Sequence, residues 1–117
     1  MTRRGDVHMV TVPRTIGSEQ RGERPALIIQ NDLGNQYSGT TIIAMMTSQD
    51  RGYDFHVPAT GDQLKLRGRS YVILEQLRTV AMERLGRSLG KVDEYTMEQV
   101  DAALHRSLGI RYCPAAS

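Results

Sequence analysis

The chain has 117 residues and a mass of 13.1 kDa, the size of one small domain, which excludes a multi-domain architecture. Hydrophobic residues make up 39% and charged residues 24%, a balance that excludes disordered and collagen-like proteins. The net charge of +2 identifies no partner, but only two of the 15 basic residues are lysines. Arginine can hold a phosphate through two parallel hydrogen bonds, so this bias favours a phosphate-rich partner, with codon usage in a GC-rich genome as the alternative.

The chain contains one cysteine, Cys113, and no apolar run of about 18 residues that could span a membrane. A single cysteine excludes an internal disulfide, and its position near the C-terminus predicts a bystander rather than a nucleophile. Residues 1–6 lack the apolar segment of a secretion signal. We therefore expect a cytoplasmic protein.

Strand-like segments precede any helix in this sequence. Alternating side chains predict a first strand over residues 7–12, followed by a long polar loop over residues 14–23. Apolar or β-branched runs predict further strands, strongly over 26–29, 40–46 and 71–74 and more weakly around 55–57 and 64–66. Turn residues such as Asn31, Asp32 and Gly34 separate the runs, so we expect short connections between most strands.

Helical periodicity begins only after Leu77. A short helical turn is predicted over 81–85, and a final amphipathic helix has one apolar face made of Met97, Val100, Leu104 and Leu108. Thr96 with Gln99 has the form of a capping box at its start, and Gly109 suits its end.

These elements predict a mainly β fold. Five or six short strands followed by one helix fit a small, strongly bent antiparallel sheet or a partly open barrel that the helix closes on one side. We expect one domain over residues 1–117, with a core of about 4–110 and a short C-terminal tail.

Metal and nucleotide sites have little support in the sequence. His8, His56 and His105 are far apart and lack the spacing of metal ligands. No glycine-rich loop joins a strand to a helix, as a phosphate-binding loop would. We therefore expect neither a metal nor another cofactor.

Polar residues gather where three predicted strands end. They are Ser18, Glu19, Gln20 and Arg24 in the long loop, Thr47, Ser48 and Gln49 after residue 46, and Glu75, Gln76, Arg78 and Thr79 after Leu74. A bent sheet can bring strand ends to one groove, where arginine, hydroxyl and amide groups would suit a phosphodiester and exposed base edges. The alternative is that they are ordinary turn residues, with Arg24 paired to Glu19 or Glu23.

Several short motifs follow one another at characteristic spacings between about Arg4 and Ile110. They are Arg4-Gly5-Asp6-Val7, Gly17 to Pro25, Asn31-Asp32, Thr47-Ser48-Gln49, Glu75-Gln76-Leu77-Arg78-Thr79, Arg84-Leu85-Gly86 and Ser107-Leu108-Gly109. Together they resemble the MazF/PemK/Kid family of toxin endoribonucleases. Glu75 departs from the Asp that many members carry, and Arg21 and Glu23 add charges beside Arg24, which affects the RNA sequence preferred rather than the reaction.

The resemblance implies an SH3-like barrel of the plasmid-maintenance-toxin type that forms a homodimer. It implies metal-independent cleavage of single-stranded RNA at short sequences, by attack of a ribose 2′-hydroxyl on its own phosphate. Such a toxin inhibits translation and growth, and a cognate antitoxin protein inhibits the toxin. Arg24 and Thr47 match the positions to which the family's catalysis is assigned.

The remaining candidate residues would bind RNA. We expect Glu19, Gln20, Ser48, Gln49 and Gln76 to read unstacked bases, because sequence-specific RNA recognition mostly uses single strands. Arg78 would contact the RNA backbone. His8 and His56 remain possible proton shuttles, because histidine is the side chain suited to proton transfer near neutral pH.

Two other functions stay open at this point. The same barrel also serves proteins that poison DNA gyrase by binding, without cleaving anything, and it could equally be a catalytically silent RNA- or peptide-binding module. Fold alone does not decide between them. The presence of Arg24 and Thr47 within their motifs favours the endoribonuclease.

Overall fold

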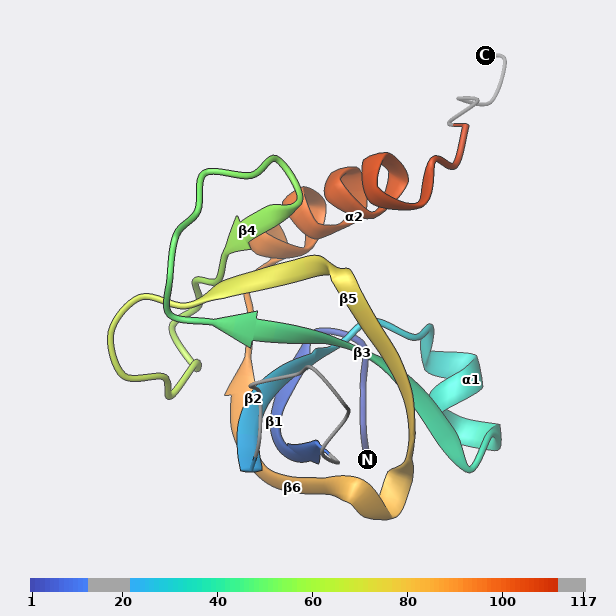
Figure 1. The fold of residues 1–117 in the computed structure, drawn as a ribbon. Helices are drawn as coiled ribbons and strands as arrows, with labels where there is room; N and C mark the ends of the chain where they lie inside the picture. Colours follow the sequence, from blue (N-terminus) through green and yellow to red (C-terminus); the bar gives the residue numbers. More distant parts are fainter. Residues whose placement is uncertain (13–21, 112–117) are drawn as a thin grey trace.

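The computed structural model describes residues 1–12 and 22–111 of the chain. Its elements, in chain order, are β1 (Asp6–Val12), β2 (Gly22–Ile28), α1 (Asp32–Tyr37), β3 (Thr40–Thr47), β4 (His56–Pro58), β5 (Tyr71–Ala81), the 3-10 helix η1 (Met82–Arg84), β6 (Leu85–Lys91) and α2 (Glu94–Leu108) (Figure 1). The predicted mainly β fold with a C-terminal helix is confirmed. No helix within the described ranges is both long enough and apolar enough to cross a bilayer.

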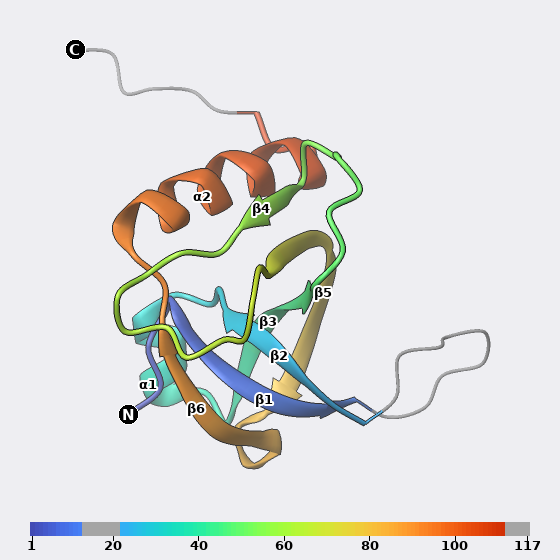
Figure 2. The ribbon, with the colours of Figure 1, turned by 90° about the vertical axis from the view of Figure 1, so that its left-hand side faces the viewer.

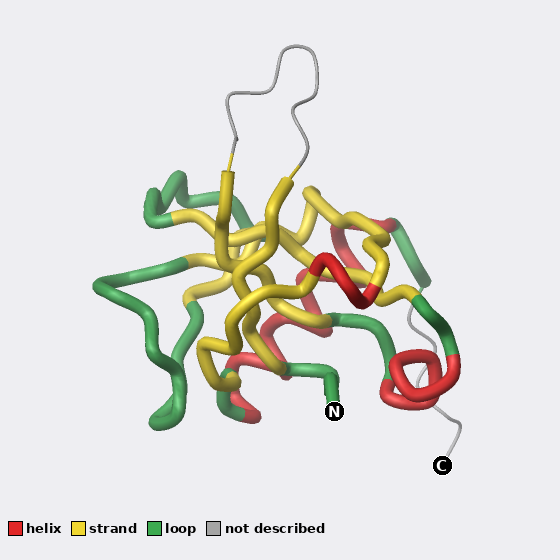
Figure 3. The backbone as a smooth tube through the Cα atoms, turned by 90° about the horizontal axis from the view of Figure 1, so that it is seen from below, coloured by secondary structure: helices red, strands yellow, loops and turns green. Residues whose placement is uncertain are grey.

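The described strands form one antiparallel sheet in the order β4-β5-β3-β2-β1-β6. The sheet is strongly curled, and seen from below its strands cross near the centre while loops lie at the outside (Figure 3). Bulges account for part of this curl, because an extra residue bends a strand and increases its twist. The β1–β6 register shifts twice, on either side of His8.

The largest irregularity lies between β3 and β5. Ala44 pairs with Leu77 and Met46 with Val72, so β5 advances five positions while β3 advances two. The surplus segment contains Glu75 and Gln76, which are exposed, and β5 turns sharply in this part of the molecule (Figure 1).

Two apolar clusters occupy the two faces of the sheet. Leu27 belongs to the larger one, which α2 covers with Val100 and Ala103. Its neighbours Ala26 and Ile28 belong to the smaller cluster, as expected for a strand whose side chains alternate between faces. Figure 2 shows α2 lying along β4 over the larger cluster.

Four sequence predictions of secondary structure need correction. The segment 64–66 is not a strand, although Leu64 and Leu66 pack on the larger cluster. Strand β6 was not predicted, because only Leu89 among its side chains is buried and its place in the sheet depends on backbone pairing with β1. Helix α1 replaces an expected turn. The expected loop over 14–23 is shorter, since Gly22 and Glu23 belong to β2, and the rest of it lies outside the described residues, as does Cys113.

The start of α2 lies earlier than the capping-box prediction placed it. Asp93 is the N-cap, and its Oδ1 accepts a hydrogen bond from the Thr96 backbone N–H at 2.8 Å. Thr96 is buried, and its hydroxyl lies 3.0 Å from that of Thr60. Gly109 ends the helix in the left-handed conformation, as predicted, whereas Leu108 is exposed and Ala103 takes part in the buried face.

We expect Asp93→Asn to make folding less sensitive to acid. Hydrogen bonds from the Thr96 backbone, from the Thr96 side chain and from Thr60 lower the pKa of Asp93 below its ordinary value of 3.8. The stability contributed by the ionised form is therefore complete above that value and is lost as pH falls through the lower folded-state pKa. Asparagine keeps the capping acceptor but does not titrate.

Thermal midpoints measured between about pH 7 and pH 2.5 check this expectation. Below about pH 4 the midpoint of Asp93→Asn should fall less steeply than that of the parent. Asp93→Ala, which loses the cap at every pH, should already be lower at neutral pH. Parallel curves for parent and Asp93→Asn would contradict the role assigned to this carboxylate.

Candidate active site

The end of β3 and the start of β4 meet the first half of β5 around a small polar cavity. Thr47 pairs with Tyr71 and His56 with Ile73, so Thr47 and His56 both lie beside the beginning of β5. The cavity measures about 120 Å³ and is lined by Thr47, Arg51, Tyr53, His56, Ile73, Glu75 and Gln76. Two residues predicted from separate motifs, Thr47 and Gln76, therefore share one site, which we call the Thr47 pocket.

Thr47 is half-buried at the end of β3, and its hydroxyl is held by the following turn. The Oγ1 atom accepts a hydrogen bond from the backbone N–H of Gln49 at 3.2 Å. A hydroxyl that accepts in this way keeps its own hydrogen free to donate to another group. The geometry suits Thr47 to orient an acceptor such as a phosphate oxygen.

Arg24 lies on β2, on the same face of the sheet as Thr47. Ala26 pairs with Met45, and this register carried two residues further places Arg24 opposite Thr47, beyond the last paired residues of β2 and β3. Alternate residues of a strand share a face. The two candidate catalytic residues therefore share a face of the sheet beyond the paired part of β2 and β3, but Arg24 lines neither the Thr47 pocket nor a second, larger cavity.

The Arg24 side chain has no partner of opposite charge among the described residues. Ion pairs there are Arg4 with Asp101 and His56 with Glu75, so the expected alternative of an Arg24–Glu23 pair is wrong, and Glu19 lies outside the described part. The Arg24 Nε is buried and has no hydrogen-bond acceptor within these residues. Leaving a buried N–H without an acceptor costs about 1–3 kcal/mol of stability. Binding of an anion that accepts a hydrogen bond from this group would therefore be favourable.

The other predicted RNA-binding residues are spread around this region. Ser48 and Gln49 are exposed in the turn after β3, and the side-chain Oε1 of Gln49 accepts a hydrogen bond from the Arg51 guanidinium at 3.3 Å. Glu19 and Gln20 lie outside the described residues. Arg78 does not line the Thr47 pocket but belongs to a second cavity.

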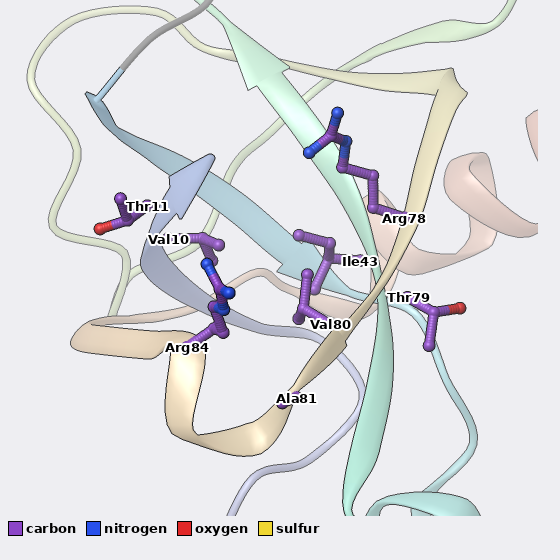
Figure 4. Close-up of a pocket in the computed structure, with 8 residues that line it drawn as sticks. All are labelled: Val10, Thr11, Ile43, Arg78, Thr79, Val80, Ala81 and Arg84. Carbon is purple, nitrogen blue, oxygen red and sulfur yellow. The ribbon is translucent and has the colours of Figure 1, made fainter. Parts of the chain in front are cut away.

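The second cavity is larger, about 400 Å³, and lies over the smaller apolar cluster (Figure 4). Val10, Ile43 and Val80 form an apolar floor, while Arg78 rises from β5 and Arg84 extends from η1 towards Val10. Within the described part of the chain no carboxylate lines it; the other described lining residues are Thr11, Thr79 and Ala81. Such a surface suits an anion attached to an apolar group, which is compatible with the predicted contact between Arg78 and an RNA backbone.

The Thr47 pocket also contains a histidine–carboxylate pair that sequence reasoning did not foresee. The His56 Nε2 lies 3.2 Å from the Glu75 Oε1, with the histidine side chain 4% exposed and the glutamate 43%. His8, the other possible shuttle, is hydrogen-bonded instead to the backbone oxygen of Gly86 and lines neither cavity. The aromatic run from Tyr53 to His56 was the available signal, but its pairing depends on the β4–β5 register.

Other motif residues hold the barrel together rather than forming a site. Asn31 caps α1, and Asp32 accepts a hydrogen bond from the Arg4 backbone N–H at 2.7 Å. The Ser107 hydroxyl donates to the backbone oxygen of Leu74 at 2.7 Å. Among residues 1–12 and 22–111, no three His, Cys, Asp or Glu side chains form a cluster that could hold a metal ion.

Comparison with known proteins identifies relatives over nearly the full length. The model of the family described as PemK-like, MazF-like toxin of type II toxin-antitoxin system matches residues 3–108. Endoribonuclease EndoA of Bacillus subtilis (strain 168) is 38% identical over 112 residues, which cover 94% of this chain and 97% of the relative.

Solved structures agree with this relationship. A mycobacterial endoribonuclease in complex with its cognate antitoxin superposes with a TM-score of 0.78 at 27% identity, covering 97% of this chain and 100% of that one. A MazE-MazF structure from Deinococcus radiodurans has the same fold, with a TM-score of 0.75 at 24% identity, covering 94% of this chain and 97% of that one. These findings confirm the resemblance seen in the sequence. The chain belongs to the PemK-like, MazF-like toxins of type II toxin–antitoxin systems.

Proposed function

We propose that this toxin is an endoribonuclease that cleaves single-stranded RNA without a metal ion and thereby inhibits translation and growth. The observation that carries the proposal is the placement of Arg24, without a carboxylate partner in the described residues, on the same sheet face as the Thr47 hydroxyl. Homology to Endoribonuclease EndoA, at 38% identity, supports the same reaction.

The substrate supplies the nucleophile in this reaction. The ribose 2′-oxygen loses its proton and bonds to the adjacent phosphorus, while the bond from phosphorus to the 5′-oxygen breaks and that oxygen gains a proton. The products are a 2′,3′-cyclic phosphate and a 5′-hydroxyl. The tasks left to the protein are positioning and stabilisation of the charge that develops on the non-bridging oxygens.

Arg24 and Thr47 divide these tasks. The guanidinium of Arg24 stays protonated, so it acts as a charge-stabilising donor to the scissile phosphate rather than as an acid. Thr47 orients the phosphate or the 2′-hydroxyl, since its oxygen is already held by the Gln49 N–H and its hydrogen remains available. Glu19, Gln20, Ser48, Gln49 and Gln76 read bases, and Arg78 contacts the backbone.

Two further properties follow from likeness to relatives. A cognate antitoxin protein is the expected inhibitor, because the mycobacterial endoribonuclease at 27% identity was solved with its own antitoxin. A homodimer is the expected form, as the family resemblance implies, and we propose that it acts in the cytoplasm.

Incubation with a long defined transcript in the presence of a chelator tests the reaction. We expect discrete fragments with 5′-hydroxyl ends at a short recurring sequence, which ligation that is selective for these ends would map. Inhibition of purified DNA gyrase without RNA scission would support the gyrase-poisoning alternative. A gel shift without scission would support a silent RNA-binding barrel, and either result would contradict the proposal.

A further inference from the structure

Tyr53 presents a half-exposed aromatic ring at the rim of the Thr47 pocket. The ring is 50% exposed, yet it is held in place from behind. It stacks on Phe55, with ring centroids 5.0 Å apart and planes 16° apart, and meets His56 edge-on at 5.2 Å. A ring that is supported on one side and open on the other resembles the platforms on which unstacked bases lie.

Glu75 lies in the same pocket, with its carboxylate fixed by a buried histidine. The His56 Nδ1 is buried and has no partner within the described part of the chain, whereas Nε2 faces the Glu75 Oε1. A proton on Nε2 explains both observations. Nε2 then donates to Glu75, and Nδ1 carries no hydrogen that would need an acceptor. His56 thus donates to one oxygen of Glu75 and leaves the remaining acceptor positions of the carboxylate open towards the pocket.

We propose that the Thr47 pocket holds an RNA base beside the scissile phosphate, stacked on Tyr53 and with an exocyclic amino group hydrogen-bonded to Glu75. The proposal rests on the proposed endoribonuclease function and assigns His56 as the residue that positions Glu75. A carboxylate accepts from the N4 amino group of cytosine but is repelled by the O4 carbonyl that uracil carries at the same place. The pocket therefore prefers cytosine to uracil.

Binding of two matched oligonucleotides tests this preference without requiring cleavage. Oligo-C and oligo-U of equal length, with 2′-fluoro groups in place of the nucleophile, differ at C4, which carries an amino group in cytosine and a carbonyl in uracil, and at N3, which carries a hydrogen only in uracil. A hydrogen bond to a charged group is stronger than one between neutral groups, so we expect the parent to bind oligo-C at least about 10-fold more tightly. Glu75→Gln, which can donate as well as accept, should bring this ratio close to one.

Variants of His56 separate positioning from general structure. His56→Gln places an amide donor near the position of Nε2 and should keep most of the C-to-U ratio. His56→Asn is too short to reach Glu75 and should lower the ratio towards that of Glu75→Gln. Equal ratios in these two variants would show that His56 does not position the carboxylate.

Variants of Tyr53 test the stacking platform. Tyr53→Leu should weaken binding of both oligonucleotides about 10-fold, because every base has an aromatic face that stacks on the tyrosine ring. Tyr53→Phe should recover most of that loss. The matched control is Tyr95→Leu, which removes a tyrosine that is 68% exposed on α2 and should leave binding unchanged.

The outcomes distinguish this inference from the proposed function. If the parent cleaves the transcript but binds oligo-C and oligo-U equally, the base-binding assignment is wrong while the nuclease stands. The same conclusion follows if Tyr53→Leu matches Tyr53→Phe. If the parent shows the C-to-U ratio but no scission, the pocket binds a base and the enzymatic proposal fails.

Discussion

Arg24→Ala should slow RNA cleavage by about 10²–10³-fold, the usual effect of removing one donor that stabilises charge in a transition state. The guanidinium stands without a carboxylate partner in the described residues, so its charge is available to the phosphate. The substitution should lower mainly the cleavage rate of the enzyme–RNA complex rather than the affinity for RNA, because charge on the phosphate oxygens increases during the reaction. Single-turnover cleavage of one labelled oligonucleotide measures that rate directly.

Two further variants separate this role from a general loss of charge. Arg87→Ala removes an equal charge from an exposed position on β6 that lines neither cavity, and it should cleave at nearly the parental rate. Arg24→Lys keeps the charge but loses the planar fork, so an intermediate rate is expected. A folded Arg24→Ala protein that cleaves within a few-fold of the parent would contradict the assigned role.

Gly90→Ala should destabilise the fold by about 3 kcal/mol or more, through backbone strain and a steric clash together. Gly90 has a φ of +97°, a left-handed value that side chains disfavour, and a Cβ there would overlap the backbone oxygen of Gln63. This oxygen belongs to a segment that is hydrogen-bonded to β6 through the Lys65 backbone N–H and the Leu89 oxygen, so relieving the clash would require the backbone to move. Urea denaturation followed by circular dichroism gives the free energy of unfolding.

Two other glycines supply graded controls for the Gly90 variant. Gly68 has a φ of +67° and no atom within 4 Å of the place that a Cβ would take, so Gly68→Ala isolates the backbone strain. Gly39 has neither a left-handed φ nor a close neighbour, and Gly39→Ala should be nearly neutral. If Gly90→Ala lowered the free energy of unfolding no more than Gly68→Ala does, close packing against Gln63 would not be the reason for a glycine at position 90.

Local pattern was sufficient to predict the strands that contribute buried side chains. β1, β3 and the start of β5 have continuous or alternating apolar residues, and all three lie close to their predicted positions. β6 escaped prediction because its sequence contains Gly86 and Gly90 and one buried residue, so long-range pairing rather than side-chain pattern makes it a strand. The cap of α2 was misplaced because Thr96 has the right chemistry but a buried, tertiary role.

The candidate site was predictable as a list of residues but not as a geometry. Strand ends and the family resemblance identified Arg24, Thr47 and Gln76. The role of His56 depends on its pairing with Ile73, which brings it beside Glu75, 19 positions along the chain. No local signal specifies such a register, so the histidine could be named as a candidate shuttle but not given a partner.

The uneven pairing of β3 with β5 bears on how this toxin could change its target. Because β5 advances five positions where β3 advances two, the side chains at 75 and 76 lie in a stretch that is not paired with β3. Replacing them would change the groups that contact a base without removing a residue pair between β3 and β5. New RNA preferences could therefore be selected at these two positions at little thermodynamic penalty to the barrel.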